Sequence, residues 1–142
     1  MLTDDYLAPS GTFVRAFEYH WMEAPAIFKR NGLYYLLASA CTGWEPNAAR
    51  CAISDSIFGP WLEWENLREG TNPDRGFRPE KTFVAQSTYV FPVAGNPDTF
   101  IAMFDIWNPE NAIDGRYVWL PVTFNKNNEF SIRWHDRWNM SV

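Results

Sequence analysis

Short alternating runs of apolar and polar residues, separated by Gly, Pro and Asn, recur along the chain. Residues 25–29 and 33–40 form two such runs, and Asn31 with Gly32 lies between them. An Asn-Gly pair in this setting is the strongest short hairpin signal, because both turn residues accept a positive φ. The pattern therefore predicts a β-hairpin. Pro25 should also keep Ala24 extended, which places the Glu23 carboxylate at the mouth of the first strand.

The same alternation predicts further strands on both sides of a long stretch without periodicity. A leading half-buried strand is expected at 13–19, and the stretch 65–81, rich in charge, Gly and Pro, reads as a connecting loop. The other strands are expected at residues 50–54, 61–64, 83–93, 100–106, 116–124 and 130–134, with turns or loops at 42–47 and 95–98. The chain thus divides into two sets of four strands after a leading strand.

These two sets form a weak internal repeat. The matching positions are Asn31-Gly32 with Gly95-Asn96, Tyr35 with Phe100, and Arg50 with Arg116. A repeating unit of four antiparallel strands is typical of a β-propeller blade. We predict an all-β chain, a single partial β-propeller domain over 1–142, with blade-like units at about 21–66 and 82–135. Two such units cannot close a ring.

Composition supports strands and turns and excludes one class of partner. Aromatic residues make up 18% of the chain, with 10 Pro and 8 Gly. The net charge of -5 and the absence of basic clusters indicate no nucleic-acid partner. No run is long and apolar enough to predict a membrane span, and the first residues carry no secretory signal pattern. Cys41 and Cys51 fit either a cross-strand disulfide or two small buried thiols.

Several long motifs together resemble one enzyme family. They are EAPAIFKRNGLYYLLAS with TGWEPN, SIFGPW, AQSTYVFPV and DIWNPENAIDGRYVWLPVTF, and they span roughly residues 2–138. In this order they resemble glycoside hydrolase family 43, and more narrowly its exo-β-1,3-galactanase (galactan 1,3-β-galactosidase) branch. The resemblance implies a five-bladed β-propeller whose axial pocket cleaves glycosidic bonds with inversion. This chain resembles the C-terminal half of such a catalytic domain.

The resemblance also implies roles for individual residues. Glu23 matches the general acid, and Gln86 matches a glutamine that positions the attacking water. The pocket-lining segments of the family match loops that carry Thr42, Trp44, Asn47, Asp105 and Trp107. Either Trp could instead belong to the packing between blades. Inverting hydrolysis separates the acid and the water-activating group by about 6.5–9.5 Å.

Partners and cofactors follow from the same resemblance. The expected substrate is a polysaccharide or oligosaccharide, and no organic cofactor is expected. Some family members hold a structural calcium ion, for which the sequence identifies no ligands. A partial propeller should associate with itself or with a missing N-terminal half. Other family 43 specificities (arabinofuranosidase or xylosidase) and a non-catalytic carbohydrate-binding or assembly fragment remain open, and a secreted or periplasmic parent enzyme is expected.

Overall fold

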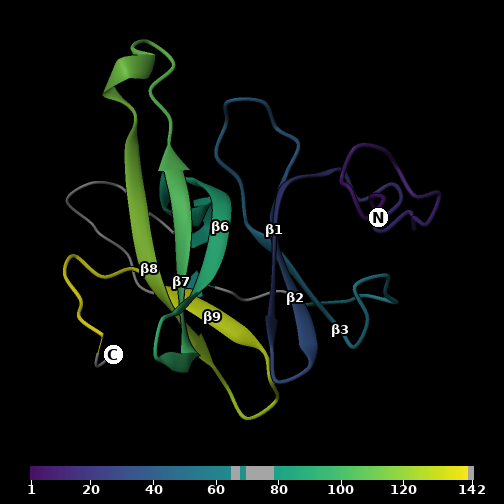
Figure 1. The fold of residues 1–142 in the computed structure, drawn as a ribbon. Coiled ribbons are helices and arrows are strands. Elements are labelled where there is room, and N and C mark those ends of the chain that lie inside the picture. The colour runs from purple at the N-terminus through teal and green to yellow at the C-terminus, as the bar shows by residue number, and fades with distance from the viewer. Residues whose placement is uncertain (65–67, 70–78, 141–142) are drawn as a thin grey trace.

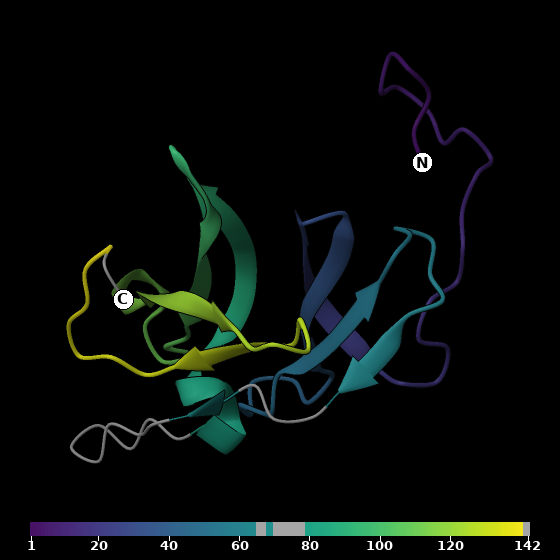
Figure 2. The same ribbon diagram turned by 90° about the horizontal axis from the view of Figure 1, so that it is seen from below.

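The computed structural model describes residues 1–64, 68–69 and 79–140, and its described residues form two β-sheets that fan apart from a common junction (Figures 1 and 2). The first sheet has the order β1-β2-β3-β4, with β1 (Met22–Arg30), β2 (Leu33–Ala40), β3 (Arg50–Ser54) and β4 (Leu62–Trp64). The second has the order β5-β9-β8-β7-β6, with β5 (Arg68–Glu69), β6 (Gln86–Val93), β7 (Asn96–Ile106), β8 (Arg116–Phe124) and β9 (Phe130–Arg133). Two short 3-10 helices, η1 (Pro79–Val84) and η2 (Ala112–Asp114), complete the described elements. The all-β prediction is confirmed.

The opening hairpin forms as predicted. Arg30 pairs with Leu33 across the turn, and Asn31 and Gly32 have φ values of 50° and 83°. Both turn residues therefore lie in the left-handed region, which Asn tolerates and Gly adopts without steric cost. The predicted strand at 50–54 is confirmed as β3, and it pairs antiparallel with β2.

The second sheet differs from the predicted set of four antiparallel strands. β5 pairs in parallel with β9 and adds a fifth strand at the edge. The prediction of a loop over 65–81 is therefore wrong at Arg68–Glu69, which form β5, and at residues 79–81, which belong to η1. The rest of the predicted loop, residues 65–67 and 70–78, lies outside the described residues. The turn predicted at 95–98 is also displaced. It falls at residues 94–95, and β7 already begins at Asn96.

The strand expected to start at residue 83 starts instead at Gln86. Thr82, Phe83 and Val84 have positive φ values, between 50° and 63°, and belong to η1. The Phe83 side chain is fully buried and lies 5.6 Å from the ring of Trp134, centroid to centroid. The apolar character of this segment therefore reflects anchoring in the core, not strand pairing.

The predicted leading strand at 13–19 does not form. Phe17 and Tyr19 have positive φ values, most of the segment is exposed, and the N-terminal residues lie away from the sheets (Figures 1 and 2). A half-buried strand needs a neighbour that supplies backbone hydrogen bonds. Within the described residues no strand runs beside this segment, and its alternation alone cannot hold it extended.

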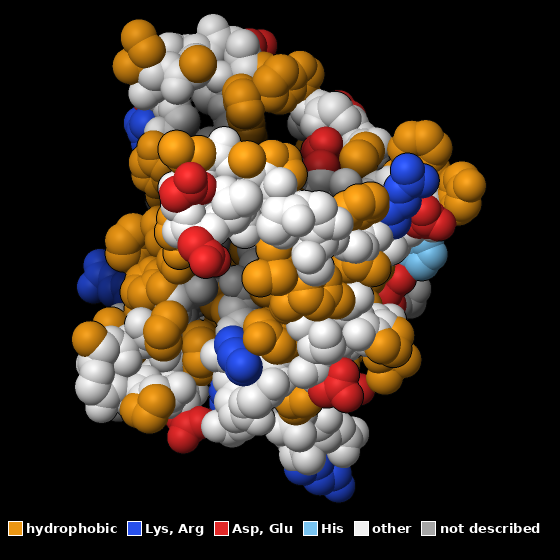
Figure 3. All heavy atoms as spheres, turned by 45° about the vertical axis from the view of Figure 1, so that its right-hand side comes forward, with side chains coloured by type: hydrophobic (Ala, Val, Ile, Leu, Met, Phe, Trp, Pro, Cys, Tyr) orange, Lys and Arg blue, Asp and Glu red, His pale blue; other side chains and the backbone are white. Residues whose placement is uncertain are grey.

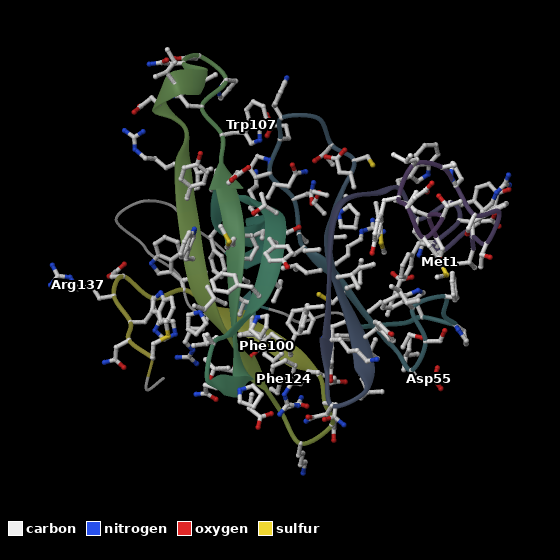
Figure 4. All side chains as sticks on the ribbon, in the orientation of Figure 1. Met1, Asp55, Phe100, Trp107, Phe124 and Arg137 are labelled. Atoms are coloured by element: carbon white, nitrogen blue, oxygen red, sulfur yellow. The ribbon has the colours of Figure 1, made fainter. Side chains whose placement is uncertain are left out.

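A core of aromatic side chains joins the two sheets. Phe28 stacks on Tyr35 within the first sheet at 5.1 Å, and it contacts Phe100 and Phe130 of the second sheet at 5.3 and 5.4 Å. Phe124 packs against the same group, and Figure 4 shows Phe100 and Phe124 at the lower end of the junction. Other hydrophobic side chains are exposed, and Figure 3 shows several of them on one face.

Candidate active site at the junction of the sheets

A β-bulge at the start of β1 sets the direction of Glu23. Glu23 pairs with Ser39, and Ala26 pairs with Leu37, so β1 takes one more residue than β2 over this interval. Because side chains alternate along a strand, the extra residue turns Glu23 to the face that carries Ala26 and Phe28. That face is turned toward the core shared by both sheets. The bulge thus directs a carboxylate toward the junction.

The backbone of the bulge differs from the sequence prediction. Ala24 has a φ of 51°, in the left-handed region, so the expectation that Pro25 keeps it extended is wrong. The carbonyl of Ala24 accepts a hydrogen bond of 2.9 Å from the Ser87 hydroxyl of β6. β6 has its own register irregularity between Ser87 and Tyr89. This bond joins the irregular segments of the two edge strands, and the neighbouring sheet thereby holds Ala24 in its strained conformation.

Gln86 reaches Glu23 across the junction. Its Nε2 donates hydrogen bonds to Glu23 Oε1 at 2.9 Å and to the Ser39 hydroxyl at 2.8 Å. The structure therefore brings together the two residues predicted as catalytic, although 63 positions separate them in sequence. All three side chains are half-buried or buried, which strengthens their mutual hydrogen bonds.

The separation of the two groups is shorter than expected. Inverting hydrolysis requires the acid and the water-activating group to lie about 6.5–9.5 Å apart. The direct contact of 2.9 Å between Gln86 and Glu23 leaves no space for a water or a sugar between those two atoms. In this arrangement the expected gap is absent, because the amide and the carboxylate satisfy each other's hydrogen bonds.

Glu23 and Gln86 both line a cavity of about 410 Å³. The loop after β2, the segment that enters β6 and the end of β7 form its walls. Of the predicted site residues, the cavity is lined by Glu23, Trp44, Asn47, Gln86, Asp105 and Trp107. Thr42 does not line it, because its hydroxyl is turned into its own loop and donates to the Glu45 carbonyl at 2.6 Å.

Asn47 and Thr82 hold the loop that forms one wall. The Asn47 side chain accepts from the Ala40 amide and donates to the Ala40 carbonyl, both at 2.9 Å, so it closes the loop between them. The Thr82 hydroxyl donates to the Asn47 carbonyl and accepts from the Ala49 amide, both at 2.7 Å. The Asn47 side chain therefore holds the loop in shape through its bonds to Ala40. Thr82 of η1 binds the backbone of the same loop at Asn47 and Ala49.

Two tryptophans meet at the rim of the cavity. The rings of Trp44 and Trp107 lie 4.2 Å apart, centroid to centroid, with planes tilted by 59°. Trp44 lies in the loop after β2 of the first sheet, and Trp107 directly follows β7 of the second. About half or more of each residue is exposed. Figure 4 shows Trp107 at the upper end of the junction, away from the aromatic core. An exposed aromatic pair beside a carboxylate offers apolar faces and a polar group to one ligand.

Cys41, which no sequence motif marked as a site residue, is a neighbour of Glu23. Desolvation raises the pKa of the Cys41 thiol, and the negative charge of Glu23 and a hydrogen bond with it raise that pKa further. Cys41 is exposed and Cys51 is buried, and no disulfide joins them, so the structure contains neither the disulfide nor a pair of buried thiols. Ser39 was not predicted as a site residue either. The available signal was its position in β2, where the alternation of Tyr35, Leu37 and Ser39 places a polar side chain on the core face.

The described residues contain no group of three or more His, Cys, Asp or Glu side chains that could hold a metal ion. Within the same residues, no helix is long and apolar enough to cross a membrane.

Comparison with known proteins identifies the family. Residues 2–80 match the model of the glycosyl hydrolases family 43, whereas no curated protein matches the chain significantly. The family 43 β-1,3-galactosidase BT3683, solved with galactodeoxynojirimycin, is similar over 98% of this chain and 38% of its own, with 42% identity and a TM-score of 0.87. The family 43 β-1,3-galactosidase BT0265 is 36% identical over 99% of this chain and 28% of its own, with a TM-score of 0.88.

An exo-β-1,3-galactanase from Clostridium thermocellum is 32% identical over 92% of this chain and 27% of its own, with a TM-score of 0.77. The chain therefore spans well under half the length of each of these structures. The family model covers more than half of the 142 residues. The chain belongs to glycosyl hydrolases family 43.

Proposed function

We propose that this chain is the part of an inverting glycosidase domain that carries the general acid. In this proposal the chain is a single partial domain, its two sheets are blades of a five-bladed β-propeller, and the missing blades come from further chain or from other copies. The family match and the all-β architecture support this arrangement. The unpaired edges of a partial propeller favour association with other copies or with a missing half.

Glu23 is the proposed general acid, and its place in the cavity carries the proposal. The β1 bulge turns its carboxyl group into the cavity, where Trp44 and Trp107 form the rim. A protonated carboxyl group there can donate its proton to the glycosidic oxygen as the bond to the sugar breaks. A sugar held against the indoles would keep that oxygen within reach of Glu23.

Gln86 is proposed to orient the attacking water. An amide cannot take up a proton at neutral pH, so its contribution is orientation and the proton must leave by another route. Its hydrogen bond to Glu23 must open in this proposal, because the sugar and the attacking water have to fit between the acid and the water-orienting group, which inverting hydrolysis separates by about 6.5–9.5 Å. The contact in this structure is then the resting arrangement, which substrate opens.

The proposed substrate is a β-1,3-linked galactan or its oligosaccharides. Two of the similar structures are described as β-1,3-galactosidases and one as an exo-β-1,3-galactanase, and the first was solved with galactodeoxynojirimycin. Their identity to this chain, between 32% and 42%, supports a shared preference for galactose. Trp44, Asn47, Asp105 and Trp107 are the proposed sugar-contacting wall.

The test measures galactose release from β-1,3-galactan together with the mass of the purified chain by light scattering. We expect the wild-type chain to release galactose as an assembly larger than one chain, and Glu23→Gln to remove nearly all of that activity. Glu110→Gln is the matched control, because Glu110 is an exposed carboxylate outside the cavity. Full activity in Glu23→Gln would refute the acid assignment, and release of arabinose or xylose in place of galactose would refute the substrate. Galactobiose binding without turnover would favour a non-catalytic module.

A further inference from the structure

Ser39 is a polar residue in a row that is otherwise apolar. Tyr35, Leu37 and Ser39 alternate along one face of β2, and the first two are fully buried in the core shared by the sheets. Ser39 is only 6% exposed. A hydroxyl in such a position costs stability unless it is hydrogen-bonded, and an apolar side chain would fit the pattern better. Its presence at this point therefore needs a reason other than packing.

The two hydrogen bonds of Ser39 connect it to both proposed catalytic residues. Its hydroxyl accepts from Gln86 Nε2 at 2.8 Å and donates to the Glu23 backbone carbonyl at 3.4 Å. Because the hydroxyl hydrogen is directed to Glu23, a lone pair of the oxygen is available for Gln86. Ser39 therefore links the bulge of β1 to the first residue of β6.

Gln86 uses both of its amide hydrogens in this arrangement. One is donated to the Glu23 carboxylate and the other to Ser39. In the proposed function the bond to Glu23 opens when the sugar and the attacking water enter between the two groups. The bond to Ser39 involves no group that reacts, so it can persist and hold the Gln86 side chain at the cavity wall, with its amide oxygen not used in either bond.

We propose that Ser39 is a positioning residue that anchors Gln86 while Glu23 acts on the substrate. The inference rests on the proposed function, since it assigns Gln86 to the orientation of water. It adds a residue that the motif resemblance did not mark, and it separates the two hydrogen bonds of Gln86 into one that opens and one that stays.

The first test follows the two side-chain amide protons of Gln86 by NMR, with and without galactodeoxynojirimycin. In the wild-type chain both protons should be protected from exchange, and the ligand should shift the proton bonded to Glu23 and leave the other protected. Ser39→Ala should abolish protection of that second proton. Loss of protection at both protons on ligand binding, or unchanged protection in Ser39→Ala, would overturn the anchoring role. This readout requires no turnover, so it is independent of whether Glu23 is the acid.

The second test is kinetic and uses Ser54→Ala as its matched control. Ser54 is 5% exposed in β3, and its hydroxyl accepts from the Ser56 amide at 3.1 Å, so the substitution removes a similar buried hydroxyl outside the cavity. We expect Ser39→Ala to lower kcat about 10-fold to 100-fold with little change in KM, as the loss of one buried hydrogen bond allows. Ser39→Thr, which keeps the hydroxyl, should recover most of kcat, and Ser54→Ala should leave it unchanged.

A double-mutant cycle distinguishes positioning from general loss of structure. If Ser39 acts through Gln86, Ser39→Ala should cost little further activity in a Gln86→Ala background. An equal loss in both backgrounds, or wild-type kcat in Ser39→Ala, would overturn the proposal. Failure of the proposed function has a different signature, since it would appear as full activity in Glu23→Gln while the Gln86 amide signals still respond to Ser39→Ala.

Discussion

Phe28 connects the two sheets, so its replacement by alanine tests whether they share one core. The ring is 6% exposed and lies 5.1 Å from Tyr35 in its own sheet, 5.3 Å from Phe100 and 5.4 Å from Phe130. Phe28→Ala therefore empties a space bounded by side chains from both sheets. Neither sheet can fill it without moving relative to the other.

The size of the effect follows from this burial. Truncation of a buried Phe to Ala costs about 3–5 kcal/mol. With an unfolding entropy of about 2.1 cal/mol/K per residue, a chain of 142 residues unfolds with about 0.3 kcal/mol/K. A loss of about 4 kcal/mol then lowers Tm by about 13 °C. In urea, with an m-value of about 2 kcal/mol/M, it lowers the midpoint by about 2 M.

The assay is thermal and urea unfolding followed by circular dichroism, with Phe91→Ala as the control. Phe91 is an aromatic residue of β6 that is only partly buried and stacks on Tyr89 at 6.5 Å, outside the shared core. Its truncation should cost about 1 kcal/mol, or about 3 °C in Tm. Equal losses for Phe28→Ala and Phe91→Ala would refute the reasoning, and so would two separate transitions in the wild-type chain.

Two further predictions concern the cavity. Trp44→Ala or Trp107→Ala should weaken galactobiose binding by about 10-fold, or about 1.4 kcal/mol, in calorimetry, because each removes an exposed indole from the rim; unchanged affinity in both variants would contradict a sugar-contacting role. The Cys41 thiol should react slowly with iodoacetamide at pH 8, because its raised pKa leaves a small thiolate fraction. Glu23→Gln should speed the reaction, because it removes a charge that raises the pKa of the thiol. Equal rates in the two proteins would show that Glu23 does not act on the thiol.

Local signals in the sequence were sufficient for the first hairpin. The turn at Asn31 and Gly32 and the alternation on either side of it involve neighbours in sequence, and the structure follows them. Alternation failed at 13–19, where the pattern is present but no partner strand is available among the described residues. It failed again at Phe83, where apolar residues enter the core from a 3-10 segment. A period of two indicates which residues share a face, and it does not indicate what that face meets.

The candidate site shows the same limit. The family resemblance marked Glu23 and Gln86, and the structure places them in contact, but their direct hydrogen bond and the Ser39 hydroxyl between them could not be read from spacing. Ser39 and Cys41 became part of the site only through pairing across strands and the course of the loop. β5 is a similar case, since its parallel pairing with β9 joins segments more than 60 residues apart.

The bulge in β1 has a consequence for how this segment tolerates insertions and deletions. Glu23 and Ala26 are three positions apart and would lie on opposite faces of a regular strand, but the extra residue of β1 places both on the core face. Deletion of Ala24 or Pro25 would leave Glu23 two positions from Ala26, so regular alternation would keep the carboxylate on the core face. The deletion would instead remove the bulge that presents the Ala24 carbonyl to the Ser87 hydroxyl of β6. A frame-preserving loss of one codon there should therefore weaken the connection between the two sheets while leaving Glu23 directed toward the junction.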